Sequence, residues 1–64
     1  MKIRMLEDAD LGGNGAEVIK AGSVGKAIGG HFFFGKDDVD GLPPTVVPFY
    51  DMDLILEFKH EILP

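Results

Sequence analysis

The sequence contains no cysteine, which excludes disulfides, thiolate metal sites and cysteine nucleophiles. No apolar run approaches the roughly 18 residues needed to cross a bilayer. The N-terminal segment MKIRMLEDAD also lacks the apolar stretch of a signal peptide. We therefore expect a protein that does not bind a membrane and that works in the reducing cytoplasm.

Side chains for catalysis are scarce as well. The only hydroxyl groups belong to Ser23, Thr45 and Tyr50. The only histidines, His31 and His60, have no companion ligands at metal-binding spacing. Because a general base needs a positioned nucleophile or substrate group, this inventory offers no recognisable catalytic set. We expect no enzyme activity, no metal and no cofactor.

Basic residues are scarce in the second half of the chain. Residues 1–36 carry five basic and four acidic side chains, whereas residues 37–64 carry one basic and seven acidic ones. An acidic segment repels a phosphate backbone, so we expect no nucleic-acid binding. It suits a basic protein partner, although solubility alone is a simpler explanation. Within it, KDDVDG lacks the terminal ligands of a calcium-binding loop.

Glycine is abundant in the segment VIKAGSVGKAIGG, which partly resembles a phosphate-binding loop. Gly25 and Lys26 match the central Gly-Lys pair of that motif. However, Lys20 stands where the first glycine is required, and Ala27 stands where a hydroxyl residue binds magnesium. The segment is therefore more typical of a strand that bends than of a nucleotide site.

In that interpretation the glycines are required by the backbone conformation and not by a ligand. Gly22 allows a positive φ in a turn, and Gly25 allows a bulge or a close approach of another segment. Val24, Ile28 and Ile19 are then expected to supply core side chains.

The hydrophobic pattern predicts a mostly β protein. Met1, Ile3 and Met5 alternate with polar residues, as in a half-buried strand. Further short strands are expected near residues 17–22, 23–30, 31–35 and 45–50, for about five strands in a single domain over residues 1–64.

The C-terminal segment is ambiguous. Leu54, Leu56 and Phe58 alternate, which favours a strand over residues 53–59, followed by a tight turn at HEI (residues 60–62) and a last short strand. The alternative is an α+β protein with a C-terminal helix over residues 52–63.

Two segments carry a resemblance to a known fold. IKAGSVGKAIG and DLILEFKHEILP, within residues 16–30 and 52–64, resemble the pattern of small SH3-like β-barrels. The resemblance implies a barrel with a short 3₁₀ turn near the C-terminus and no catalytic residues. Proteins of this pattern include accessory subunits of photosystem I, ferredoxin–thioredoxin reductase and nitrile hydratase, and small bacterial and phage proteins.

The run HFFF is the most conspicuous apolar feature. Alternation places Phe32 and Phe34 on one side of a strand and Phe33 on the other, so Phe33 is expected to face outward. We expect a non-enzymatic accessory module, of bacterial or phage origin, that acts through protein–protein contact or self-association. The alternative is an acidic inhibitor that mimics nucleic acid toward a basic enzyme. The expected partner-binding residues are Phe33, Tyr50, Asp37, Asp38, Asp40 and Asp51.

Overall fold

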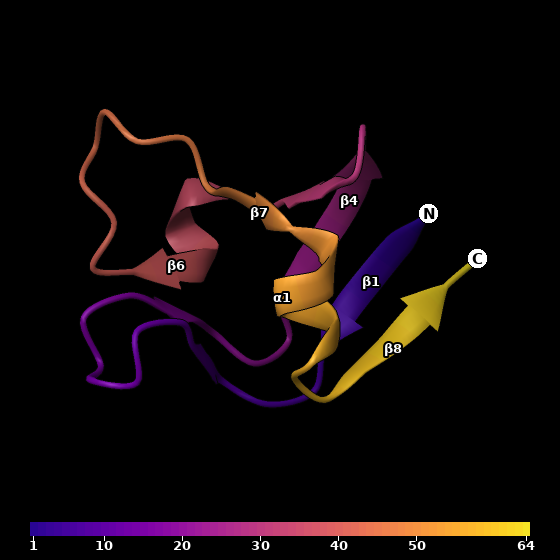
Figure 1. Cartoon of the computed structure of the whole chain (residues 1–64), viewed down its shortest axis with the longest axis horizontal. Coiled ribbons are helices and arrows are strands. Elements are labelled where there is room, and N and C mark those ends of the chain that lie inside the picture. The colour runs from indigo at the N-terminus through magenta and orange to yellow at the C-terminus, as the bar shows by residue number, and fades with distance from the viewer.

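The computed structural model describes all residues 1–64 and is mostly β, as the alternating pattern predicts (Figure 1). In chain order the strands are β1 (Lys2–Met5), β2 (Ala9–Asp10), β3 (Val18–Ile19), β4 (Val24–Ile28), β5 (His31–Phe33), β6 (Val39–Asp40), β7 (Phe49–Asp51) and β8 (His60–Leu63). The helices are the 3₁₀ helix η1 (Lys36–Asp38) and the α-helix α1 (Met52–Leu56).

The strands form two antiparallel sheets. One has five strands in the order β7-β5-β4-β1-β8, and the other has three in the order β2-β3-β6. The edge strands β7 and β8 are not hydrogen-bonded to each other, so the larger sheet is open. Figure 1 shows that α1 carries the chain from the β7 edge toward the β8 edge.

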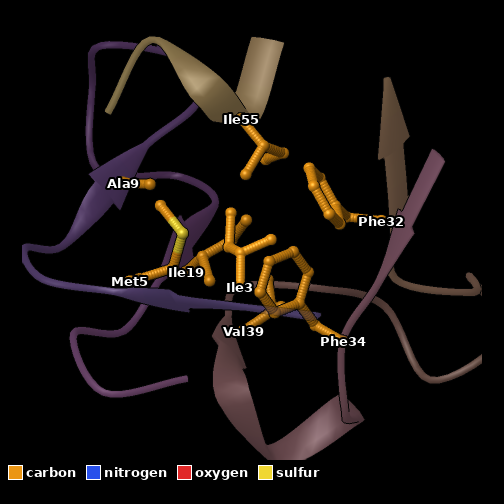
Figure 2. Close-up of a cluster of buried hydrophobic side chains, with 8 residues drawn as sticks. All are labelled: Ile3, Met5, Ala9, Ile19, Phe32, Phe34, Val39 and Ile55. Atoms are coloured by element: carbon orange, nitrogen blue, oxygen red, sulfur yellow. The ribbon is translucent and has the colours of Figure 1, made fainter. Parts of the chain in front are cut away.

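The core lies between the two sheets and α1 (Figure 2). Ile3 and Met5 enter it from β1, as the alternation predicts, and Ile19 enters from β3. Phe32 lies opposite them and is fully buried. The complete set of buried apolar side chains is Ile3, Met5, Ala9, Ile19, Phe32, Phe34, Val39 and Ile55.

The expectation that Val24 and Ile28 fill the core is wrong. Their side chains are 39% and 51% exposed, because Gly25 and Ala27 occupy the inward positions of β4. A Cβ atom at Gly25 would lie 2.6 Å from Cζ of Phe34. The small inward residues of β4 therefore leave room for the ring of Phe34. As a result, the residues expected to face the core face solvent instead.

The predicted strand over residues 53–59 is also wrong. The chain instead forms α1, a turn and then β8, so the alternative helix over residues 52–63 is right only for its first five residues. The tight turn predicted at residues 60–62 is wrong as well, because these residues belong to β8. The helix buries Ile55 and leaves Leu54 and Leu56 each 37% exposed. A strand would have placed both leucines on the side opposite Ile55, whereas the core accepts only Ile55.

Candidate functional site

The five-stranded sheet has one face on the core and one face toward solvent, and the solvent side is the candidate site. Strand alternation and pairing register identify the side chains on it. We call this surface the outer face; its residues are Lys2, Arg4, Val24, Lys26, Ile28, His31, Phe33, Phe49, Asp51, Glu61 and Leu63.

A single row of directly opposed residues crosses all five strands of the outer face. Lys2 pairs with Leu63 on one side and with Lys26 on the other. Lys26 pairs in turn with Phe33, and Phe33 with Phe49. Opposed side chains on one face lie about 4.5–5.5 Å apart at Cβ. The row therefore runs from an aliphatic residue, over two lysines, to two aromatic rings.

The aromatic end of the row is an ordered cluster. The rings of Phe33 and Phe49 stack at a centroid distance of 5.4 Å and an interplanar angle of 18°. The ring of His31 meets Phe49 edge-on at 5.1 Å, and its Nε2 lies 3.1 Å from Oδ1 of Asp51. Phe49 remains 46% exposed despite these contacts. An exposed aromatic surface that is held in place by its neighbours loses little side-chain entropy when a partner covers it.

The charge of the outer face differs from that of the rest of the molecule. It carries three basic and two acidic side chains, whereas the remaining residues carry three basic and nine acidic ones. Arg4 forms an ion pair with Glu61 across the β1–β8 pair. Lys2 and Lys26 form no ion pair and oppose each other directly. Like charges in that arrangement are unfavourable.

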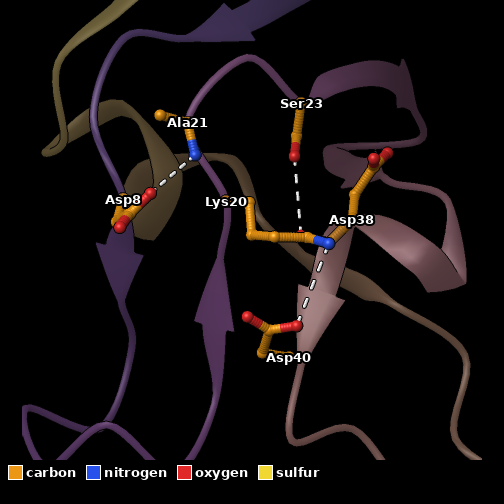
Figure 3. Close-up of polar contacts among 6 residues, drawn as sticks. All are labelled: Asp8, Lys20, Ala21, Ser23, Asp38 and Asp40. Atoms are coloured by element: carbon orange, nitrogen blue, oxygen red, sulfur yellow. Dashed lines mark hydrogen bonds and ion pairs between the residues drawn. The ribbon is translucent and has the colours of Figure 1, made fainter.

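Four of the nine acidic residues outside this face accept hydrogen bonds from the main chain. In Figure 3 the Asp8 carboxylate accepts the Ala21 N–H at 2.8 Å, and Lys20 lies 3.9 Å from Asp40. Further carboxylates that accept N–H groups of the main chain belong to Glu7, Asp10 and Asp38. These carboxylates thus stabilise loop conformations by accepting main-chain hydrogen bonds, as acidic side chains commonly do in turns.

Tyr50 lies on the opposite side of β7 from Phe49 and faces inward. Its hydroxyl donates a 2.6 Å hydrogen bond to Oε2 of Glu17, which lies just before β3. Burial, together with this hydrogen bond and the negative charge of Glu17, raises the pKa of Tyr50 well above its usual range. Tyr50 therefore joins the two sheets and is not part of the outer face.

The structure separates the six residues expected to form a patch. Phe33 and Asp51 lie together on the outer face, with Phe33 half-buried beside Phe49. The other four lie elsewhere: Tyr50 faces inward, Asp37 and Asp38 belong to η1, and Asp40 belongs to β6 of the smaller sheet. The neighbours of Phe33 on this face are thus mainly basic and apolar.

Sequence reasoning did not connect Lys2 and Lys26 with Phe33. The alternation of β1 already places Lys2 on the outside. The outward direction of Lys26, however, depends on Gly25 and Ala27 facing inward, and neither of these residues carries a hydrophobic signal strong enough to show it.

No protein-family model, curated protein or solved structure matches this chain. The structure has no pocket, and no group of three or more histidine, aspartate or glutamate residues is placed to hold a metal ion. No helix reaches the length and apolar character that crossing a membrane requires.

Proposed function

We propose that this protein is a non-enzymatic binding module that acts through protein–protein contact on its outer face. The observation that carries the proposal is the Phe33–Phe49 stack, in which Phe49 is exposed and Phe33 half-buried, beside two lysines without acidic partners. Aromatic anchors with a polar surround are typical of protein interfaces. Charge complementarity implies a partner that presents carboxylates next to apolar side chains.

The fold that we propose for this module is an SH3-like barrel. The strand order β7-β5-β4-β1-β8, with a short helix between the last two strands, supports it. Gly25 also provides the close packing expected from the glycine pattern. In keeping with the resemblance, we propose a cytoplasmic accessory protein of bacterial or phage origin.

The alternative, an acidic inhibitor that mimics nucleic acid, has weaker support. It needs many free carboxylates on one surface. In this chain Glu7, Asp8, Asp10 and Asp38 accept hydrogen bonds from the main chain, and Glu17 accepts one from a tyrosine. Phe49→Ser separates the two functions, because binding through the outer face depends on the aromatic stack and mimicry by carboxylates does not.

The proposal is tested by comparing captured partners of matched variants in a lysate of the source cells. Phe49→Ser and Lys26→Glu change the outer face, whereas Lys36→Glu makes the same charge change on η1. We expect the outer-face variants to lose a partner that the wild type and Lys36→Glu both retain. Phe33→Ala should lose the same partner as Phe49→Ser, and it should lower the melting temperature less than truncation of the fully buried Phe32, because Phe33 is only half-buried. Identical captured proteins for all variants would overturn the proposal.

A further inference from the structure

The two lysines at the centre of the outer face have no ion-pair partner within a single molecule. Lys2 and Lys26 oppose each other across β1 and β4, and neither has an acidic partner. A directly opposed pair of like charges destabilises a sheet. Apolar residues flank the pair along β4, since Val24 and Ile28 are 39% and 51% exposed. An incoming group that suits this place has two carboxylates close together and apolar side chains beside them.

The exposed side of α1 has the complementary arrangement. Asp53 lies in α1, and Glu57 follows its last residue in helical conformation, so the two are one turn apart with Cβ atoms about 5–6 Å from each other. Neither carboxylate has a hydrogen-bond or ion-pair partner. Leu54 and Leu56 flank them, each 37% exposed. Because Ile55 is fixed in the core, the helix cannot rotate these four side chains away from solvent.

These two surfaces match in spacing, charge and apolar surround. About 5 Å separates directly opposed residues on a sheet, and a similar distance separates residues one turn apart on a helix. Each like-charge pair is unfavourable alone and is relieved by the other. We infer that the outer face of one molecule binds α1 of a second copy, with Asp53 and Glu57 over Lys2 and Lys26. This inference rests on the proposed function and names the partner.

The contact joins two different surfaces, so it is heterologous. Each molecule has one outer face and one α1, and the association continues head to tail until a ring closes or the chain of subunits stays open. A five-residue helix covers far less than the roughly 800 Å² per partner of a stable interface. The association is therefore weak, depends on concentration between the micromolar and millimolar range, and decreases with salt.

Two complementary variants test the inference by sedimentation velocity. The face variant is Lys2→Glu with Lys26→Glu, and the helix variant is Asp53→Lys with Glu57→Lys. Wild type should sediment faster as its concentration rises, and each variant alone should remain monomeric. An equimolar mixture should associate again head to tail as wild type does. The intact α1 of the face variant meets the intact face of the helix variant, and the reversed α1 and the reversed face are complementary as well. The affinity in each variant alone should fall by about tenfold or more.

A control variant must carry the same charge change away from the outer face. Lys20→Glu with Lys36→Glu makes the same charge change as the face variant on other surfaces and should associate like wild type. If the helix variant unfolds, Asp53→Asn with Glu57→Gln is used in its place, because it removes the two negative charges without introducing positive ones. A wild type that is monomeric at millimolar concentration, a mixture that stays monomeric, or association of either variant alone with the affinity of wild type overturns the inference. If the wild type is monomeric but captured partners still depend on Phe49, the proposed function stands and only self-association fails.

Discussion

At the residue scale, Gly25 and Gly22 are required for different physical reasons. A Cβ atom at Gly25 would lie 2.6 Å from the ring of Phe34, so this position is restricted by packing. A Cβ atom at Gly22 would meet nothing within 4 Å, but the φ of this residue is +88°, so it is restricted by backbone conformation, as its predicted turn role implies. Both residues thus serve the fold, in agreement with the interpretation of the segment as a bending strand.

We predict that both alanine substitutions lower the free energy of unfolding, and that only one can be rescued. Gly25→Ala should cost about 1–3 kcal/mol through overpacking, and Gly22→Ala about 1–2 kcal/mol through backbone strain. Adding Phe34→Leu should recover part of the loss in Gly25→Ala and none in Gly22→Ala. Urea denaturation of the single and double variants measures this coupling. Equal coupling of Phe34→Leu to both glycines would contradict the assignment.

At the element scale, α1 is held by one side chain. A five-residue helix is too short to be stable alone in water. Its only buried residue is Ile55, which contacts the same core as Phe32 from β5 (Figure 2). The helical conformation is therefore a consequence of placing Ile55 in the core and returning the chain to β8.

This predicts a sharp contrast between neighbouring positions of α1. Ile55→Ala should lower the free energy of unfolding by about 2–5 kcal/mol, which is a large part of the roughly 3–10 kcal/mol expected for a domain of this size. Leu54→Ala should cost less, about 1 kcal/mol, because the side chain is 37% exposed and lies outside the core. Thermal unfolding followed by circular dichroism compares the two. A Leu54→Ala loss as large as that of Ile55→Ala would contradict the orientation of α1.

At the scale of the whole molecule, the two sheets are joined by the core and by one polar link. The Tyr50 hydroxyl from β7 donates to the Glu17 carboxylate just before β3, across 33 positions of sequence. The pKa of Tyr50 is raised chiefly by burial and then by Glu17. The neutral hydroxyl is thus required for the sheets to stay joined at this point.

The link predicts a specific loss of stability in alkaline solution. Unfolded tyrosine releases its proton near pH 10, whereas folded Tyr50 retains it because its pKa is higher. The folded state then binds more protons than the unfolded state, so stability is complete below pH 10 and falls as pH rises above it. Tyr50→Phe should lack this component, although lysine titration remains in both proteins. Parallel stability curves above pH 10 for wild type and Tyr50→Phe would contradict the prediction.

The distribution of charge is also a property of the whole molecule. The sequence shows an acidic second half, from which a patch around Phe33 was expected. In the folded chain η1 and β6 carry part of that charge to the smaller sheet, as the Asp40–Lys20 contact shows (Figure 3). Lys2 and Lys26 from the first half meet Phe33 instead. Strand pairing thus determines which charges surround the aromatic rings.

The sequence alone determined the features that depend on neighbouring residues. The alternation of β1 correctly predicted Ile3 and Met5 as core residues, and that of β5 correctly separated Phe32 from Phe33. Gly22 was correctly placed in a turn with positive φ. Each of these follows from a side-chain or backbone preference that acts within a few residues.

Only the tertiary structure decided the features that depend on distant segments. The faces of β4 follow from the Phe34 ring that occupies the space above Gly25, and the helical form of α1 follows from the single core position open to Ile55. The outer face depends on register between β1, β4, β5 and β7. Local patterns do not contain this information, because packing and strand pairing join residues that are far apart in the chain.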